Sequence, residues 1–218
     1  VRDPHASRTV IDLVPPDLRS ARIYPVGRLD LDSEGMLLLT NDGPWADRIL
    51  HPRHGVEREY ALGLERPLDA DQIELLRAGI ELDEGLATLI NLRQMTNVEV
   101  ARLVELLRPA PPDLHWYRAT LTQGWKRQLR RMFGAVGAPV QRLVRVRIGP
   151  VRIDGLPSGR IRALKAPEVR GLGAGGGRSR AASAVRPAAS AARPAASDPA
   201  ADPSDAPPAR ARRSRAPR

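Results

Sequence analysis

The order of apolar and polar residues changes its period along the chain and predicts both strands and helices. In GMLLLTND, four large apolar residues follow one another from Met36 to Leu39, which is typical of a strand covered on both faces. Strands with one buried face are predicted where apolar and charged residues alternate, in VEREYALGLE (56–65) and VQRLVRVRIGP (140–150). LHWYRATLTQG (114–124) also resembles a strand.

Helices are predicted in three places. Pro44 stands near the first turn of a short one over residues 44–52, and Asp69 is a candidate N-terminal cap for the next. The third has its apolar residues at offsets of three and four and ends at Gly137; they are Leu129, Met132, Phe133 and Val136. Residues 98–113 stay unassigned, because their apolar spacing allows a helix while a proline cluster allows only a short one. The pattern predicts an α+β fold.

Composition divides the chain near Val169. Beyond this point Ala, Pro, Gly, Ser and Arg supply nearly every residue, so a segment over 169–218 cannot bury enough apolar surface to offset its loss of chain entropy. We therefore expect a folded domain over residues 1–168 and a disordered basic tail over 169–218. Of the formal net charge of +10, the nine Arg and three Asp after residue 170 supply +6, so the body carries only +4. The charge favours nucleic acid as a partner.

Several function classes are excluded or disfavoured by what the sequence lacks. It has no cysteine, which excludes disulfides, thiolate nucleophiles and zinc sites of the cysteine type. His51 and His54 have no carboxylate or histidine neighbours at a spacing typical of a metal site, so no metal is predicted. No apolar run approaches the roughly 20 residues that span a bilayer, and VRDPHASRTV shows no signal-peptide pattern. We expect a cytoplasmic protein without membrane contact.

Two stretches carry candidate chemistry. GRLDLDSEG places Asp30 and Asp32 next to a predicted buried strand, where a carboxylate is costly unless it is paired. Two interpretations stay open for Asp30: it caps local backbone amides, or it is held for reaction against a cation. In QGWKRQLRRMFGAVG, cations gather at a helix start, where they oppose the helix dipole. They either meet phosphates or a buried carboxylate, or form an ordinary solvated face.

Three blocks of the chain resemble one known family. GRLDLDSEGMLLLTNDG (27–43) is similar to the signature of ribosomal RNA pseudouridine synthases that modify single uridines: Arg, Leu, Asp, two residues, Ser or Thr, one residue, Gly, and an apolar run. GVEREYALGL (55–64) and the long closing block over residues 127–164 follow in the family's order. The resemblance covers nearly all of the body. It implies the pseudouridine synthase fold, a central mixed, mainly antiparallel sheet flanked by helices, and no metal or organic cofactor.

The same resemblance assigns roles to individual residues. It implies that Asp30 is the catalytic aspartate, that Tyr60 is the active-site tyrosine, and that Arg130 pairs with the aspartate. Arg28 corresponds to an arginine near the flipped nucleotide, with the role of filling the gap in the RNA stack. The expected RNA contacts come from the basic block: Lys126, Arg127, Gln128 and Arg131.

The implied function is isomerisation of one uridine in ribosomal RNA by a monomer, with large-subunit RNA favoured over small-subunit RNA. The alternatives are a non-catalytic RNA-binding or ribosome-assembly protein with the same fold, and a synthase for transfer RNA, which the closing block disfavours. Two departures stand out. The family's small N-terminal RNA-binding module is expected to be missing, and Trp125 and Lys126 replace the usual Arg and Asn, which affects local RNA contacts.

Overall fold

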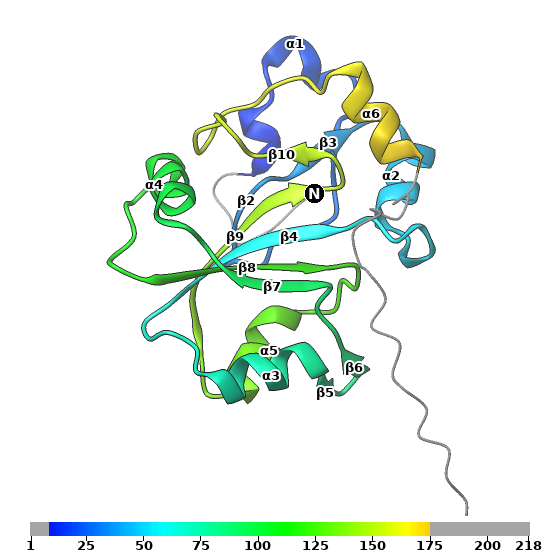
Figure 1. The fold of residues 1–218 in the computed structure, drawn as a ribbon. Coiled ribbons are helices and arrows are strands. Elements are labelled where there is room, and N and C mark those ends of the chain that lie inside the picture. Colours follow the sequence, from blue (N-terminus) through cyan, green and yellow to red (C-terminus); the bar gives the residue numbers. More distant parts are fainter. Residues whose placement is uncertain (1–8, 175–218) are drawn as a thin grey trace, which may run out of the picture. The chain divides into compact units, whose positions relative to one another are not determined.

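The structure is a computed structural model that describes residues 9–174. A six-stranded sheet crosses its centre in the order β10-β9-β4-β8-β7, with β2 beside β9 (Figure 1). All neighbours in this sheet are antiparallel except β2 and β9, which are parallel. The expected α+β class and the mixed, mainly antiparallel sheet are confirmed. The strands of this sheet are β2 (Glu34–Gly35), β4 (Arg58–Leu64), β7 (Asn91–Gln94), β8 (His115–Leu121), β9 (Val140–Ile148) and β10 (Val151–Arg152).

Helices and two small two-stranded sheets surround this centre. The small sheets pair β1 (Tyr24–Val26) with β3 (Leu38–Thr40) and β5 (Ile80–Leu82) with β6 (Gly85–Ala87). The α-helices are α1 (Pro16–Arg19), α2 (Gly43–Leu50), α3 (Ala70–Ala78), α4 (Asn97–Leu106), α5 (Gln128–Ala135) and α6 (Ala166–Gly173). Short 3-10 helices are η1 (Val10–Leu13) and η2 (Pro52–His54).

Each face of the central sheet has its own apolar cluster. One cluster joins Leu62 and Leu64 of β4 to α3 and α5, which lie together on one side of the sheet in Figure 1. Ala61 points to the opposite face, where it packs with Leu103 of α4. This alternation follows from the two-residue period of a strand. A third cluster joins β1, β3, α2 and α6 around the end of β9.

Most predicted elements are present, and N-terminal caps explain where three of the helices begin. Asp42 accepts a hydrogen bond from the backbone N–H of Trp45 at the start of α2, and Asp69 caps α3 as expected. The unassigned segment forms α4, whose start is fixed by Thr96 and Glu99 in a reciprocal capping box. No helix within residues 9–174 has the length and apolar character needed to cross a bilayer.

Two strand predictions are wrong in detail. The run from Met36 to Leu39 is not one strand covered on both faces: β3 begins at Leu38, and Leu37 and Leu39 are only half-buried. The reason is that the backbone N–H of Met36 still bonds to β9, after which the chain leaves the central sheet and pairs with β1. In β9, the expected exposed face includes Arg145, yet this arginine is buried.

The predicted boundary at residue 168 falls inside a helix. Helix α6 runs across it, and Leu172 is buried against the third cluster. The apolar side chain at this position keeps the helix on the body, so the folded part extends at least to residue 174. The rest of the expected tail, residues 175–218, lies outside the described residues, and its disorder stays a prediction.

Gly35 is the position where β2 meets β9. Its φ is +100°, and a Cβ there would lie 2.7 Å from the backbone nitrogen of Arg145 and still closer to its carbonyl oxygen. Both conditions require glycine, because the backbone cannot retreat without breaking the parallel pairing. Gly35, the last residue of the GRLDLDSEG stretch, thus allows the loop before it to join the sheet.

Gly35→Ala is therefore expected to lower the free energy of unfolding by about 3 kcal/mol, which combines a left-handed backbone with an overpacked contact. Gly155→Ala is the matched control, since its φ is +71° but nothing lies within 4 Å of the added Cβ. It should cost only about 1 kcal/mol. Urea unfolding of both variants gives the comparison; equal losses would contradict the close-contact argument.

Candidate active site

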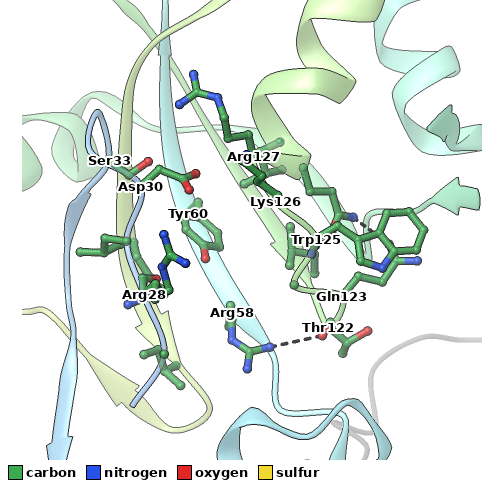
Figure 2. A pocket seen from close by; sticks show the side chains of 18 of the residues that line it. Arg28, Asp30, Ser33, Arg58, Tyr60, Thr122, Gln123, Trp125, Lys126 and Arg127 are labelled. Atoms are coloured by element: carbon green, nitrogen blue, oxygen red, sulfur yellow. Dashed lines mark hydrogen bonds between the residues drawn. The ribbon is translucent and has the colours of Figure 1, made fainter. Parts of the chain in front are cut away.

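A cleft of about 650 Å³ opens on the α5 side of the central sheet. One wall is the loop over residues 26–33, the floor is formed by β4 and β9, and the opposite wall is the segment over residues 121–129 that leads into α5. Figure 2 shows side chains from these walls around a common space. The predicted residues Arg28, Asp30 and Tyr60 all line it, together with Lys126, Arg127 and Gln128.

Asp30 is half-buried in the loop wall. Its backbone carbonyl accepts a hydrogen bond of 2.9 Å from the N–H of Ser33, which closes a tight turn. Its carboxylate points into the cleft (Figure 2) and has no hydrogen bond or ion pair to any residue between 9 and 174. The capping interpretation of Asp30 therefore has no support, and the carboxylate is free to meet a ligand.

The second acid of the stretch, Asp32, pins the same loop to α5. Both of its carboxylate oxygens accept hydrogen bonds of 2.8 Å from Arg127, and Arg130 lies 3.2 Å away. The hydrogen bonds from Arg127 hold the pKa of Asp32 below its ordinary value. In turn, the bond to Asp32, and more weakly the charge of Asp30, raise the pKa of Arg127. Asp32 thus anchors the loop that presents Asp30.

Arg130 pairs with Asp32 and not, as expected, with Asp30. Besides this ion pair, its guanidinium donates to the backbone carbonyls of Asp32 and Val140 and it does not line the cleft. The turn between Asp30 and Ser33 explains the difference: the carboxylate of Asp30 points into the cleft (Figure 2), whereas that of Asp32 is bound by Arg127 and Arg130. Arg130 contacts the catalytic candidate only through the loop.

The four expected RNA contacts separate into two groups. Lys126 and Arg127 are exposed at the cleft wall. Gln128 is only 4% exposed, and it donates to the side chain of Gln123 at 2.7 Å, so it shapes the wall rather than offering a free surface. Arg131 points elsewhere and pairs with Glu84 at 2.7 Å, on the turn between β5 and β6. Of these four residues, Lys126 and Arg127 precede α5, whereas Gln128 and Arg131 lie in its first turn.

Two arginines of the cleft floor were not predicted. Arg58 donates to the carbonyls of Ile49 and Thr122, and burial lowers its pKa. A sequence signal for it exists, since Arg58 and Tyr60 are two residues apart on one strand and must share a face. Arg145 is 4% exposed and donates to the carbonyls of Met36 and Arg28, at 2.7 and 3.1 Å. Its remaining terminal nitrogen is buried without a partner among the described residues.

A β-bulge explains why the position of Arg145 was missed. The register of β9 on β4 shifts so that Glu59 lies opposite Arg147 while Tyr60 lies opposite Arg145. The two arginines, although two residues apart, therefore lie on opposite faces of the sheet. Arg147 and Arg118 bond to the buried Glu59 on the α4 face; burial raises the pKa of Glu59, but these bonds outweigh it and the pKa is lowered. A strand without a bulge would place Arg145 and Arg147 on the same face.

The cleft is electrostatically asymmetric. Four of its cations have no ion pair to a carboxylate within residues 9–174: Arg28, Arg58, Lys126 and Arg145. Asp30 is the single carboxylate among the lining residues. An uncompensated cluster of this kind favours a ligand with phosphates, and the lone carboxylate supplies one reactive group. No group of three or more potential metal-ligating side chains occurs in the part of the chain that the structure describes.

Comparison with known proteins decides the family. Residues 3–135 match the family model described as RNA pseudouridylate synthase. The chain belongs to this family. A solved structure described as a pseudouridylate synthase matches with a TM-score of 0.61 and 28% sequence identity, over 75% of this chain and 65% of that one. The expected pseudouridine synthase fold is confirmed.

Curated members of the pseudouridylate synthase family are similar in sequence. A ribosomal large subunit pseudouridine synthase B of Yersinia pestis is 39% identical over 158 residues, which is 72% of this chain and 45% of that protein. The corresponding protein of Escherichia coli K12 is 38% identical over the same length, or 50% of that protein. An uncharacterized RNA pseudouridine synthase of Aquifex aeolicus is 35% identical over 171 residues, 78% of this chain and 63% of that protein. The chain spans about half the length of the first two relatives.

Arg145→Lys is expected to loosen the loop of this family member. Lysine keeps the charge but cannot bridge the carbonyls of Arg28 and Met36 in the same planar geometry, so about 2 kcal/mol of unfolding free energy should be lost. Hydrogen exchange in residues 28–36 should accelerate. Arg152→Lys on β10, where the arginine is exposed, is the control. Equal exchange in the two variants would show that Arg145 does not hold the loop.

Proposed function

We propose that this chain is the catalytic domain of a pseudouridine synthase that isomerises a uridine in ribosomal RNA, with Asp30 as the catalytic residue. The observation that carries the proposal is the free carboxylate of Asp30, directed into a cleft whose other charged groups are cationic. Family membership supplies the reaction class. The relatives named for the large ribosomal subunit favour that RNA over the small-subunit RNA.

The reaction needs one ionised carboxylate and an enclosed base. The bond from ring nitrogen 1 to the ribose breaks, the uracil turns, and a bond from ring carbon 5 to the ribose replaces it; carbon 5 loses a proton and nitrogen 1 gains one. Asp30 acts either as a nucleophile or as the base that removes a ribose proton, and both routes require its charged form.

The cleft also suits the shape of the substrate. A uridine within a stacked helix exposes neither its glycosidic bond nor carbon 5, so the nucleotide has to turn out of the stack. The ring of Tyr60, on the cleft floor, offers an aromatic face for the everted base (Figure 2). Lys126 and Arg127 on the wall are placed for the flanking phosphates.

The proposal includes a monomer that acts in the cytoplasm without a cofactor. Nothing in the proposed chemistry is oxidised or reduced. The residues named above supply the acid–base and binding groups that the isomerisation needs.

Asp30→Asn should abolish release of tritium from a 23S ribosomal RNA transcript labelled at uracil carbon 5. A loss of about three orders of magnitude in turnover is expected, because the neutral amide neither attacks nor removes a proton. Asp113→Asn, an exposed carboxylate outside the cleft, is the matched control and should keep wild-type turnover. No release by the wild-type chain would instead favour the non-catalytic RNA-binding alternative.

A double-mutant cycle tests whether Arg130 acts through Asp32. Each of Arg130→Gln and Asp32→Asn should lower turnover by about tenfold, because each releases the loop of Asp30 from α5. The double variant should be no slower than the slower single variant, since both remove one anchor. Multiplicative losses, with all variants folded by circular dichroism, would mean that Arg130 acts on the reaction independently of Asp32.

A further inference from the structure

Arg58 and Arg145 are neighbouring cations on the floor of the cleft. Burial is the main reason that the pKa of Arg58 is lowered, and the charge of nearby Arg145 adds to it. Both guanidinium groups donate to backbone carbonyls, and neither has a carboxylate partner within residues 9–174. Like charges held out of water without a counterion are unfavourable. The two arginines therefore favour a ligand that brings an electron-rich atom to this end of the cleft.

Arg58 keeps one donor free for such a ligand. A guanidinium carries five N–H donors. The terminal nitrogens of Arg58 donate to the carbonyls of Val56, Thr122 and Ile49. Its Nε has no hydrogen-bond partner in the described chain and, unlike one terminal nitrogen of Arg145, it is not buried. The backbone bonds thus hold the guanidinium in place while the Nε–H stays available to the cleft that Arg58 lines.

Tyr60 lies between Asp30 and Arg58 in Figure 2, with its hydroxyl on the side of Arg58. Arg58 and Tyr60 are two residues apart on β4, about 6.8 Å along a strand, and both line the cleft. In the proposed reaction Asp30 acts at the ribose or close to it. A base held on the ring of Tyr60 therefore turns the edge that is farthest from the ribose towards Arg58.

The base carries a carbonyl at that far edge both before and after the reaction. In uridine the ribose is attached to ring nitrogen 1, and the opposite ring atom, carbon 4, bears oxygen O4. In pseudouridine the ribose is attached to carbon 5, and the opposite atom, carbon 2, bears oxygen O2. Cytidine has an amino group in place of O4, and this group donates hydrogen bonds. One fixed N–H donor therefore fits uracil in both orientations and opposes cytosine.

We infer that Arg58 binds the carbonyl opposite the ribose and selects uracil against cytosine, an inference that rests on the proposed function. Its Nε–H donates to O4 of the everted uridine and to O2 once the base has turned. Arg145, on the adjacent strand, adds positive potential at the same place without offering an acceptor to a cytosine amino group. Because the guanidinium is already fixed by backbone carbonyls, little reorganisation is needed when the base arrives.

The selection is measured as the affinity for a 23S ribosomal RNA fragment that carries either uridine or cytidine at the mapped target position. Every chain carries Asp30→Ala, so no reaction occurs. This background should bind the uridine fragment about thirtyfold more tightly, because cytidine loses a charge-assisted hydrogen bond. Adding Arg58→Gln should lower the ratio to about threefold, since an amide oxygen accepts from the amino group. Adding Arg58→Lys keeps a cationic donor and should retain a ratio of about tenfold.

Arg19→Gln is the matched control. Arg19 also donates to backbone carbonyls, those of Asp12 and Val14, but it lies outside the cleft, so its loss should leave the ratio unchanged. A second measurement needs no change at Arg58. Sulfur accepts hydrogen bonds more weakly than oxygen, so 4-thiouridine at the target position should weaken binding to the Asp30→Ala chain by about fivefold, whereas 2-thiouridine should change it by less than about twofold.

The results separate this inference from the proposed function. If Arg58→Gln leaves the preference for uridine unchanged, the inference is overturned; an equal fall in affinity for both fragments would mean that Arg58 binds a phosphate instead. Equal binding of the two thiouridine fragments would overturn it as well. In each of these cases, release of tritium by the wild-type chain keeps the synthase activity standing. If the wild-type chain releases no tritium, the proposed function fails and the inference fails with it.

Discussion

The buried guanidinium of Arg145 is the interaction on which the rest of the site depends. It donates to carbonyls at both ends of the loop that carries Asp30, while Gly35 lets that loop approach β9 closely enough for the bonds to form. Without these donors, the carbonyls of Arg28 and Met36 would lose hydrogen bonds, which costs free energy of folding. The loop conformation and the arginine therefore stabilise each other. A reactive carboxylate on a loop needs such support, because moving the carboxylate by about 1 Å strongly lowers the reaction rate.

The bulge in β9 divides the arginines of the sheet between two tasks. On the α4 face, Arg118 and Arg147 neutralise the buried Glu59 and hold β4 in place. On the opposite face, Arg145 is aimed at the cleft, next to Tyr60. Without the shift in register, both β9 arginines would lie on one face, and either the cleft or Glu59 would lack its cation.

The two acids of the GRLDLDSEG stretch show how close neighbours take different roles. Asp32 is fully engaged by Arg127 and Arg130, whereas Asp30 is left without a partner in the described chain. An ion pair at half-exposed Asp32 contributes little to overall stability but fixes geometry. Because Asp32 pairs with Arg127 and Arg130, these cations do not bind the carboxylate of Asp30, which stays free for a ligand.

The sequence by itself determined the class of fold, the capped helices and the family, and it predicted Asp30 and Tyr60 as site residues, because these follow from local periodicity, caps and contiguous motifs. Only the tertiary structure decided that Arg130 pairs with Asp32, that Gln128 is buried and that Arg145 faces the cleft. Those outcomes depend on a register shift and on contacts between segments about a hundred residues apart. The local pattern of residues predicts neither the register shift nor these contacts, since a two-residue alternation looks the same on both sides of a bulge.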